Sequence, residues 1–191
     1  MTQLESAVAG VVTKEMKVVA EKERMDEEVL CSLVAAGKVV IPCNKQHTSI
    51  SPEGIGKRLR TKVNVNLGTS KDVTDYDSEI EKVDRAIRLG AESIMDLSTH
   101  GDTRIFRRKL IETSPVMIGT VPIYDSVIHH QKDLGELTAQ DFLDTIRLHA
   151  QDGVDFITIH SGITRKTIDQ IKNHKRLLNI VSRGGSLVFA W

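Results

Sequence analysis

The sequence predicts an α/β protein built around a parallel sheet, because short buried strands alternate with helices along the chain. The expected strands begin near residues 62, 92, 116, 155 and 178, at spacings of about 24 to 38 residues that suit repeated strand and helix units. They are mostly apolar rather than alternating, as strands covered on both faces are. "LGAESIMDLS" (89–98) and "DGVDFITIHS" (152–161) also share one junction, in which a glycine ends a helix before a buried strand.

From the residues alone, two architectures fit this pattern, a (β/α)₈ barrel and an open doubly wound sheet. About five units are predicted, which would complete an open sheet but not a barrel of eight strands. The predicted strands are 62–68, 91–98, 116–124 and 154–162, with 179–185 as a last strand and its turn, and the helices are 78–90, 103–113, 138–153 and 164–177. Ser78 and Glu81 are spaced as a capping box. Phe142, Ile146 and Ala150 are expected on the inward face of their helix.

Residues 1–61 are predicted to form a small, mainly helical region ahead of the main domain, 62–191. Thr13 and Asp26 are placed to cap two helices. "KVVIPC" (38–43) is a predicted strand. The polar stretch after it, rich in Gly, Ser and Pro, is expected to be a long functional loop that joins the two parts.

Composition excludes several classes of partner. Lys plus Arg and Asp plus Glu both number 26, so the net charge of zero gives no reason to expect nucleic acid or an anionic membrane. No apolar run approaches the roughly 20 residues that a membrane span needs, and the N-terminus carries no secretion signal. A cytoplasmic location is therefore expected. Cys31 and Cys43 match no metal or redox spacing and are expected to be reduced structural thiols.

Polar and functional side chains gather where the predicted strands end, the edge at which parallel α/β folds bind ligands. Each has an ordinary alternative: Asn66 could be a turn residue, Asp96 could cap its loop, and His160 could be a core histidine. Their shared placement at five strand ends is what indicates a site. The set is Asn66, Gly68, Met95, Asp96, Ser98, His100, Tyr124, His160, Ser161, Ser182, Arg183, Gly184 and Gly185.

The "SRGG" turn (182–185) has the chemistry of an anion site. Two glycines let the backbone approach an anion closely, and backbone N–H groups at a helix N-terminus favour negative charge. Arg183 could chelate two oxygens. The alternative is a tight turn with a solvated arginine. Neither a Walker motif nor a GxGxxG fingerprint is present, so a nucleotide cofactor fold is not predicted.

Five segments in order carry a family resemblance: "GIGKRLRTKVNVNLGTS", "SIMDLSTHGD", "SPVMIGTVPIY", "GVDFITIHSG" and "IVSRGG". Together they resemble the phosphomethylpyrimidine synthase family, and the resemblance runs from about residue 1 to 191. It implies a (β/α)₈ TIM barrel of which this chain holds about the first five units. It also implies a radical S-adenosylmethionine lyase of thiamine biosynthesis that converts 5-aminoimidazole ribotide to hydroxymethylpyrimidine phosphate. "SLVFAW" (186–191) would then begin the fifth barrel helix.

Carried over to this sequence, the resemblance implies that the ribotide pocket is lined by Asn66, Met95, Tyr124 and His160. Ser182, Arg183 and Gly184 would hold the phosphate. Asp96 and His100 are candidates from the residues alone. The resemblance further implies a [4Fe-4S] cluster, S-adenosylmethionine and a divalent metal, with zinc expected. A homodimer, or a further C-terminal segment, is the expected partner.

The sequence also departs from that family. The Asp-Gly-Leu-Arg segment, the glutamate, the two metal-binding histidines and the Cys-x2-Cys-x4-Cys motif of the family are absent, and Cys43, Lys45 and His100 are unusual at their positions. The chain is therefore expected to be a substrate-binding half that is inactive alone. Three alternatives stay open: 5-hydroxybenzimidazole synthase of anaerobic cobamide biosynthesis, which takes the same ribotide, a non-catalytic ribotide-binding fragment, and another phosphate-binding barrel enzyme.

Overall fold

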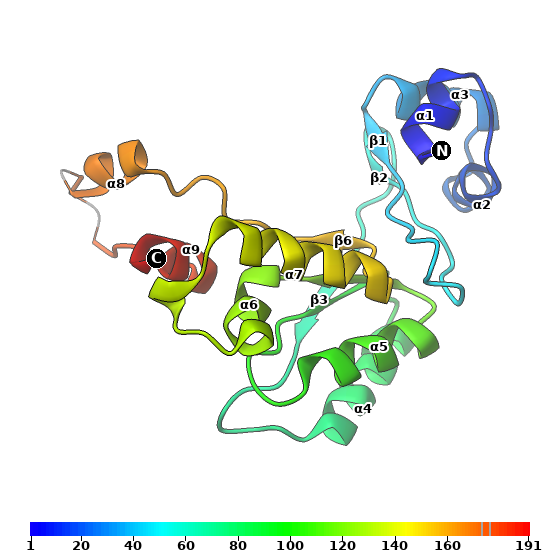
Figure 1. The fold of residues 1–191 in the computed structure, drawn as a ribbon. Coiled ribbons are helices and arrows are strands. Elements are labelled where there is room, and N and C mark those ends of the chain that lie inside the picture. The colour runs from blue at the N-terminus through cyan, green and yellow to red at the C-terminus, as the bar shows by residue number, and fades with distance from the viewer. Residues whose placement is uncertain (173, 176) are drawn as a thin grey trace.

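The computed structural model describes residues 1–172, 174–175 and 177–191. Its centre is a four-stranded parallel sheet flanked by helices (Figure 1). The strands are β3 (Asn64–Leu67), β4 (Ser93–Asp96), β5 (Met117–Thr120) and β6 (Phe156–Ile157). They lie in the order β3-β4-β5-β6, so each strand pairs with the next one along the chain. The predicted α/β class and the parallel sheet are confirmed.

The sheet is open in the part of the chain that the structure describes, with β3 and β6 at its edges. The fifth strand predicted at the start of 179–185 is wrong for the described residues, because no strand pairs with β6 there and the predicted turn opens a helix at Arg183. A new strand would have to pair with β6, whose ladder with β5 is only two residues long. The helix itself confirms the reading of "SLVFAW" as helical.

Helices follow each strand of the sheet. They are α4 (Tyr76–Arg88), α5 (Thr103–Thr113), α6 (Pro122–His130), α7 (Ala139–Asp152), α8 (Arg165–Lys172) and α9 (Arg183–Ala190), with a short 3₁₀ turn at Leu134–Glu136. The first of them begins two residues earlier than predicted, because Asp75 caps it in place of Ser78 by accepting the N–H groups of Asp77 and Ser78. The predicted end of the helix at 164–177 lies partly outside the described residues.

The strand predicted at 116–124 is too long. It ends at Thr120, and Pro122 opens α6, since proline fits the first helical turn, where its missing N–H costs nothing. Tyr124 therefore lies in the first turn of a helix rather than in a strand. The strand predicted at 154–162 is also too long. Only β6 forms there, so His160 lies in the segment that follows β6.

Alternation along the strands divides the sheet into two faces. Leu67, Ile94 and Ile118 point outward and form a core with the helices. Val83 on α4 and Phe106 and Leu110 on α5 are among the helix residues of that core. The other face carries one residue from each strand in register, because Asn66 pairs with Met95, Met95 with Gly119, and Gly119 with Phe156. This second face is called the inner face below.

The buried face of α7 is polar, which corrects the prediction for that helix. Asp141, Thr145 and His149 are buried, at four-residue spacing, whereas Phe142 and Ile146 are half-buried and Ala150 is exposed. The predicted apolar stripe is one residue away from the buried one. Polar side chains are stable there because the neighbouring helices present hydrogen-bonding partners.

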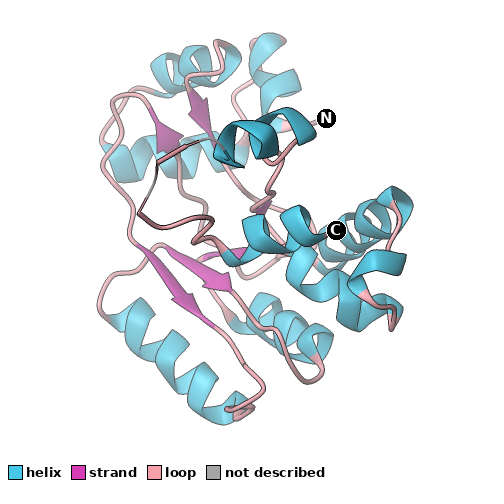
Figure 2. Ribbon diagram, turned by 90° about the vertical axis from the view of Figure 1, so that its left-hand side faces the viewer, coloured by secondary structure: helices cyan, strands magenta, loops and turns pink. Residues whose placement is uncertain are grey.

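The N-terminal region has its own helices and core. α1 (Gln3–Val8), α2 (Lys14–Glu23) and α3 (Glu27–Ala35) precede an antiparallel ribbon of β1 (Val39–Val40) and β2 (Ile55–Gly56), which stands apart from the parallel sheet (Figure 2). Thr13 and Asp26 cap α2 and α3 as predicted. The sequence did not predict β2. A domain boundary at residue 61 stays a prediction.

The segment between β1 and β2 attaches this region to the sheet. The backbone N–H of Asn44 donates to Asp155, which precedes β6, over 2.8 Å, and the Asn44 side chain donates to the carbonyls of Ala150 and Val154. Arg60, which follows β2, adds an ion pair with Glu92, which precedes β4. The segment therefore meets the N-terminal ends of the strands, opposite the edge where the candidate ligand residues lie.

No helix in the described residues has the length and apolarity to cross a bilayer.

Candidate functional site

The inner face brings two predicted site residues together near the C-terminal ends of the strands. Asn66 and Met95 are direct cross-strand partners, and the Asn66 Oδ1 accepts a hydrogen bond from Asn64 over 2.8 Å. The Thr158 hydroxyl lies 3.8 Å from the Met95 sulfur. Because Thr158 is two residues before His160, the same segment leads from the strand ends to the second group of candidates.

Tyr124, His160, Arg183 and Gly184 form that second group. The guanidinium carbon of Arg183 lies over the Tyr124 ring, 5.4 Å from its centroid, and the Tyr124 and His160 ring centroids are 6.5 Å apart. The His160 ring packs directly on Gly184, where any Cβ would overlap it. Glycine is therefore required at this position for the imidazole to approach the backbone.

These residues surround the N-terminus of α9. Ser182 caps the helix by accepting the N–H of Gly185 over 3.1 Å. The N–H groups of Arg183 and Gly184 lie in the first turn, where a helix offers its donors to ligands. Nδ1 of His160 is buried and has no hydrogen-bond partner within the described chain. A buried polar atom without a partner beside the N–H donors of a helix start is an arrangement that favours binding of a polar ligand.

Asp96 and His100 lie elsewhere. Asp96 points to the outer face, opposite Met95, and its Oδ1 accepts the N–H of Ser98 over 2.9 Å, which is the capping role that its position also allowed. Burial raises the pKa of Asp96 to about 6. His100 is exposed in the loop before α5, and its backbone carbonyl accepts the Thr69 hydroxyl. Neither side chain belongs to the inner face.

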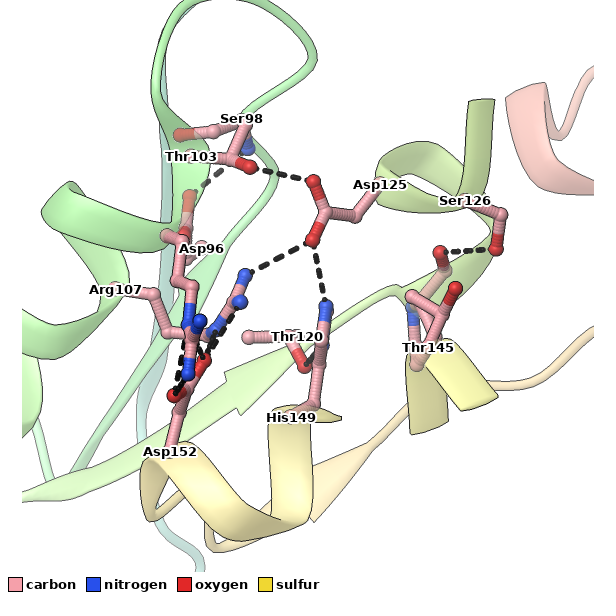
Figure 3. A network of polar contacts seen from close by, with 12 residues as sticks. Asp96, Ser98, Thr103, Arg107, Thr120, Asp125, Ser126, Thr145, His149 and Asp152 are labelled. Atoms are coloured by element: carbon pink, nitrogen blue, oxygen red, sulfur yellow. Dashed lines mark hydrogen bonds and ion pairs between the residues drawn. The ribbon is translucent and has the colours of Figure 1, made fainter. Parts of the chain in front are cut away.

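A buried polar network on the outer face was missed by sequence reasoning (Figure 3). Its centre is Asp125, which accepts hydrogen bonds from Arg107 Nη1 over 3.1 Å, His149 Nε2 over 2.9 Å and the Thr103 hydroxyl. Arg107 also bonds Asp152, over 2.9 Å. The sequence signal for this network is the four-residue spacing of polar residues on α7. That spacing identifies a network only once the side chains that pack against α7 are known.

Protonation in this network follows from the contacts. Burial would raise the pKa of Asp125, but the bonds from His149 and Thr103 and the charge of Arg107 outweigh it and lower the pKa to about 2. Burial, with the charge of Arg107, lowers the pKa of His149, which is therefore neutral. Since Nε2 donates to the Asp125 carboxylate, Nδ1 accepts the hydroxyl of Thr120 over 2.8 Å.

The Asp125, His149 and Thr120 contacts have the order of a nucleophilic triad, but their burial excludes that role. Thr120 is only 2% exposed and lies under the helices, so a substrate has no access to its hydroxyl. The network is therefore a support between α5, α6 and α7. What it supports is the first turn of α6, which also carries Tyr124.

A second buried histidine lies at the opposite end of the strands. His47 Nδ1 faces Asp155 over 2.7 Å, and Nε2 faces the carbonyl of Ser114 over 2.9 Å. Both nitrogens meet acceptors, so both carry protons and the ring is an imidazolium. Burial would lower the pKa of His47, but Asp155 raises it overall. This ion pair joins the N-terminal region to the sheet and is remote from the strand ends.

Comparison with known proteins decides the family. The model of the radical SAM ThiC family matches residues 2–191. This chain belongs to that family. It is 57% identical over 190 residues to a phosphomethylpyrimidine synthase of Clostridioides difficile, and 56% and 54% identical to those of Clostridium perfringens and Alkaliphilus oremlandii. The alignments cover the whole chain but 44% of each relative, so the chain spans less than half the length of these relatives.

The cysteines of this member of the radical SAM ThiC family do not form a cluster site. An iron–sulfur cluster of the [4Fe-4S] type is held by Cys thiolates, typically four. Cys31 and Cys43 are both free thiols that pack in the N-terminal core, and burial raises the pKa of Cys43 to about 11. No group of three His, Cys, Asp or Glu residues suited to a metal exists among the described residues. The residues present therefore fit neither cluster nor divalent metal.

Proposed function

We propose that this chain is the ribotide-binding part of a phosphomethylpyrimidine synthase of thiamine biosynthesis. The observation that carries the proposal is the partnerless Nδ1 of His160, packed on Gly184 beside the N-terminus of α9. An anionic ligand there would meet backbone N–H groups, the partial positive charge of the helix and a guanidinium together. 5-Aminoimidazole ribotide supplies such an anion in its phosphate.

Six of the seven residues that the resemblance assigns to the ribotide pocket have a direct task in this proposal. The N–H groups of Arg183 and Gly184 and the guanidinium of Arg183 bind phosphate oxygens, while Ser182 fixes the start of the helix. His160 presents Nδ1 to the same end of the ligand. Asn66 and Met95 contact the rest of the ribotide from the inner face, Asn66 by hydrogen bonds and Met95 as an apolar wall.

The barrel expected for the family is part of the proposal. Four parallel strands in chain order, with helices on the outer face, are the arrangement of consecutive units in a (β/α)₈ barrel. The inner face would then point to the barrel axis. β3 and β6 would pair with further strands, either from a longer chain or from a second copy, and a homodimer fits this need.

Membership of a radical SAM family implies S-adenosylmethionine and an iron–sulfur cluster for the complete enzyme. Their ligands, and those of any divalent metal, would come from outside this chain. The residues described here bind and orient the ribotide and perform no step of the radical chemistry. The chain alone is therefore expected to be inactive.

Calorimetry on the complete synthase chain tests the proposal. We expect 5-aminoimidazole ribotide to bind, and the riboside that lacks the phosphate to bind more weakly. Arg183→Ala should weaken ribotide binding by about 10- to 100-fold, the value of a charged hydrogen bond, and leave riboside binding unchanged. Arg147→Ala, which removes an exposed arginine on α7, is the matched control. Absence of ribotide binding, or equal losses for both ligands in Arg183→Ala, would contradict the proposal.

A further inference from the structure

We propose that Asp125 is a positioning residue for phosphate binding, acting through Tyr124 on Arg183. The inference rests on the proposed function, because it concerns the same phosphate position. Asp125 is the centre of the buried network in Figure 3, and neither ribotide binding nor the family resemblance explains that network.

The first step is the attachment of Asp125. Its carboxylate, with a side chain only 7% exposed, receives bonds from Thr103 and Arg107 on α5 and from His149 on α7. α6 has no side-chain cap at Val121, so these bonds provide the side-chain anchoring of its first turn. A carboxylate in that turn also complements the helix dipole. Asp125 therefore fixes the first turn of α6 against two other helices.

The second step leads from Asp125 to Tyr124. Adjacent residues in a helix point about 100° apart, so Tyr124 projects away from the network while sharing its rigid backbone. The Tyr124 ring is near two site residues, 5.4 Å from the guanidinium carbon of Arg183 and 6.5 Å from the ring centroid of His160. The buried carboxylate of Asp125 thus fixes the orientation of the Tyr124 ring, and the ring in turn positions groups of the site.

The Tyr124 ring holds the guanidinium of Arg183 in place. A guanidinium stacked on an aromatic face is held in place without losing its charge, and its N–H groups stay free at the edge of the plane. A carboxylate partner would hold the group equally well but would compete with phosphate. The Tyr124 platform therefore preorganises Arg183 at the start of α9, which reduces the cost of ordering it when phosphate binds.

The test separates positioning from general stability. In the complete synthase, Asp125→Asn keeps the shape of the side chain but removes the charge that Arg107 and His149 bind. We expect the Kd for ribotide to rise about fivefold and the Kd for riboside to stay within about twofold. In an Arg183→Ala background, Asp125→Asn should change ribotide affinity less than about twofold, because its effect passes through that arginine. Asp144→Asn, an exposed aspartate on α7, is the matched control.

Equal losses for ribotide and riboside, or a full loss that persists in the Arg183→Ala background, would overturn the inference and assign Asp125 to folding alone. The proposed function fails separately, if the unaltered enzyme does not bind ribotide. If it binds, and Arg183→Ala weakens it while Asp125→Asn does not, only the positioning role fails.

A second pair of variants tests the platform should Asp125→Asn not fold. Tyr124→Phe keeps an aromatic face and should keep the ratio of ribotide to riboside affinity. Tyr124→Leu removes the face and should lower that ratio about fivefold. A ratio that is unchanged in Tyr124→Leu would show that the ring does not hold Arg183, and the inference would be wrong.

Discussion

At the scale of single residues, two buried histidines differ in charge because their neighbours differ. His47 meets two acceptors and is held as an imidazolium, whereas His149 meets one carboxylate and one hydroxyl beside the charge of Arg107 and is neutral. The sequence gives no sign of this difference. Asp155, whose carboxylate raises the pKa of His47, lies 108 residues away from it, and Arg107, whose charge helps to lower the pKa of His149, lies on another helix.

The His47 ion pair predicts a pH-dependent stability. Its pKa is raised above the ordinary value of about 6.5, so its contribution is complete below that pH and is lost as pH rises through the folded value. We expect His47→Gln to lower the free energy of unfolding by about 3 kcal/mol at pH 5.5 and by less at pH 9. Urea unfolding at both pH values measures this. A cost that grows toward pH 9 would contradict the imidazolium assignment.

The raised pKa of Asp96 predicts that replacing this residue stabilises the protein, whereas His47→Gln destabilises it. The folded pKa of Asp96, about 6, exceeds the unfolded value near 4, so wild-type stability falls as pH rises from about 4 to 6. Asp96→Asn cannot ionise and should gain on the order of 2 kcal/mol relative to wild type between pH 4 and pH 7. Thermal or urea unfolding of both proteins across this range checks it. A constant difference between the two would show that Asp96 titrates normally in the folded state.

At the scale of elements, local patterns predicted helices better than strands. Capping residues such as Thr13 and Thr138 mark helix starts because they act on the adjacent turn. Strand length instead depends on pairing: the apolar run 154–162 forms only two ladder residues, and 179–185 forms none in the described chain. Asn66 and Met95, which lie on the inner face, were predicted as site residues from their place at strand ends and from the family resemblance.

The glycines of α9 predict a sharp contrast. Gly184→Ala must displace the His160 ring, so we expect ribotide affinity to fall at least tenfold, although alanine is the better helix former. Gly185→Ala, whose Cβ would approach Ile180 at 3.2 Å, needs only a small adjustment and should lose less than about threefold. Calorimetry compares them. Trp191, which donates to the carbonyl of Leu137 over 2.6 Å, provides fluorescence to report the docking of α9. Equal losses of ribotide affinity in the two variants would contradict the close contact between Gly184 and the His160 ring.

At the scale of the whole molecule, the open sheet is the main feature that the described chain leaves unsatisfied. β3 and β6 are edges, and exposed apolar residues such as Val63 and Ile159 lie beside them. A family resemblance could predict the barrel, but the part of the chain that the structure describes holds too few strands for closure by itself. The sheet order was predictable because consecutive βα units usually lie side by side.

Open edges predict association of the 191-residue chain when it is prepared alone. Unpaired strand edges pair with other copies, and an exposed inner face adds apolar area. We expect sedimentation velocity to show dimers or larger species, with a broad thermal transition. A monodisperse monomer with one cooperative transition would show that the edges are protected within the chain.

The ribotide phosphate is proposed to bind at the N-terminus of α9. A crystal structure of the complete synthase with 5-aminoimidazole ribotide measures this directly. We predict phosphate oxygens within hydrogen-bond distance of the backbone N–H groups of Arg183 and Gly184 and of the Arg183 guanidinium, with His160 Nδ1 now partnered. A ribotide bound with its phosphate away from the N-terminus of α9, and with Nδ1 of His160 still unpartnered, would contradict it.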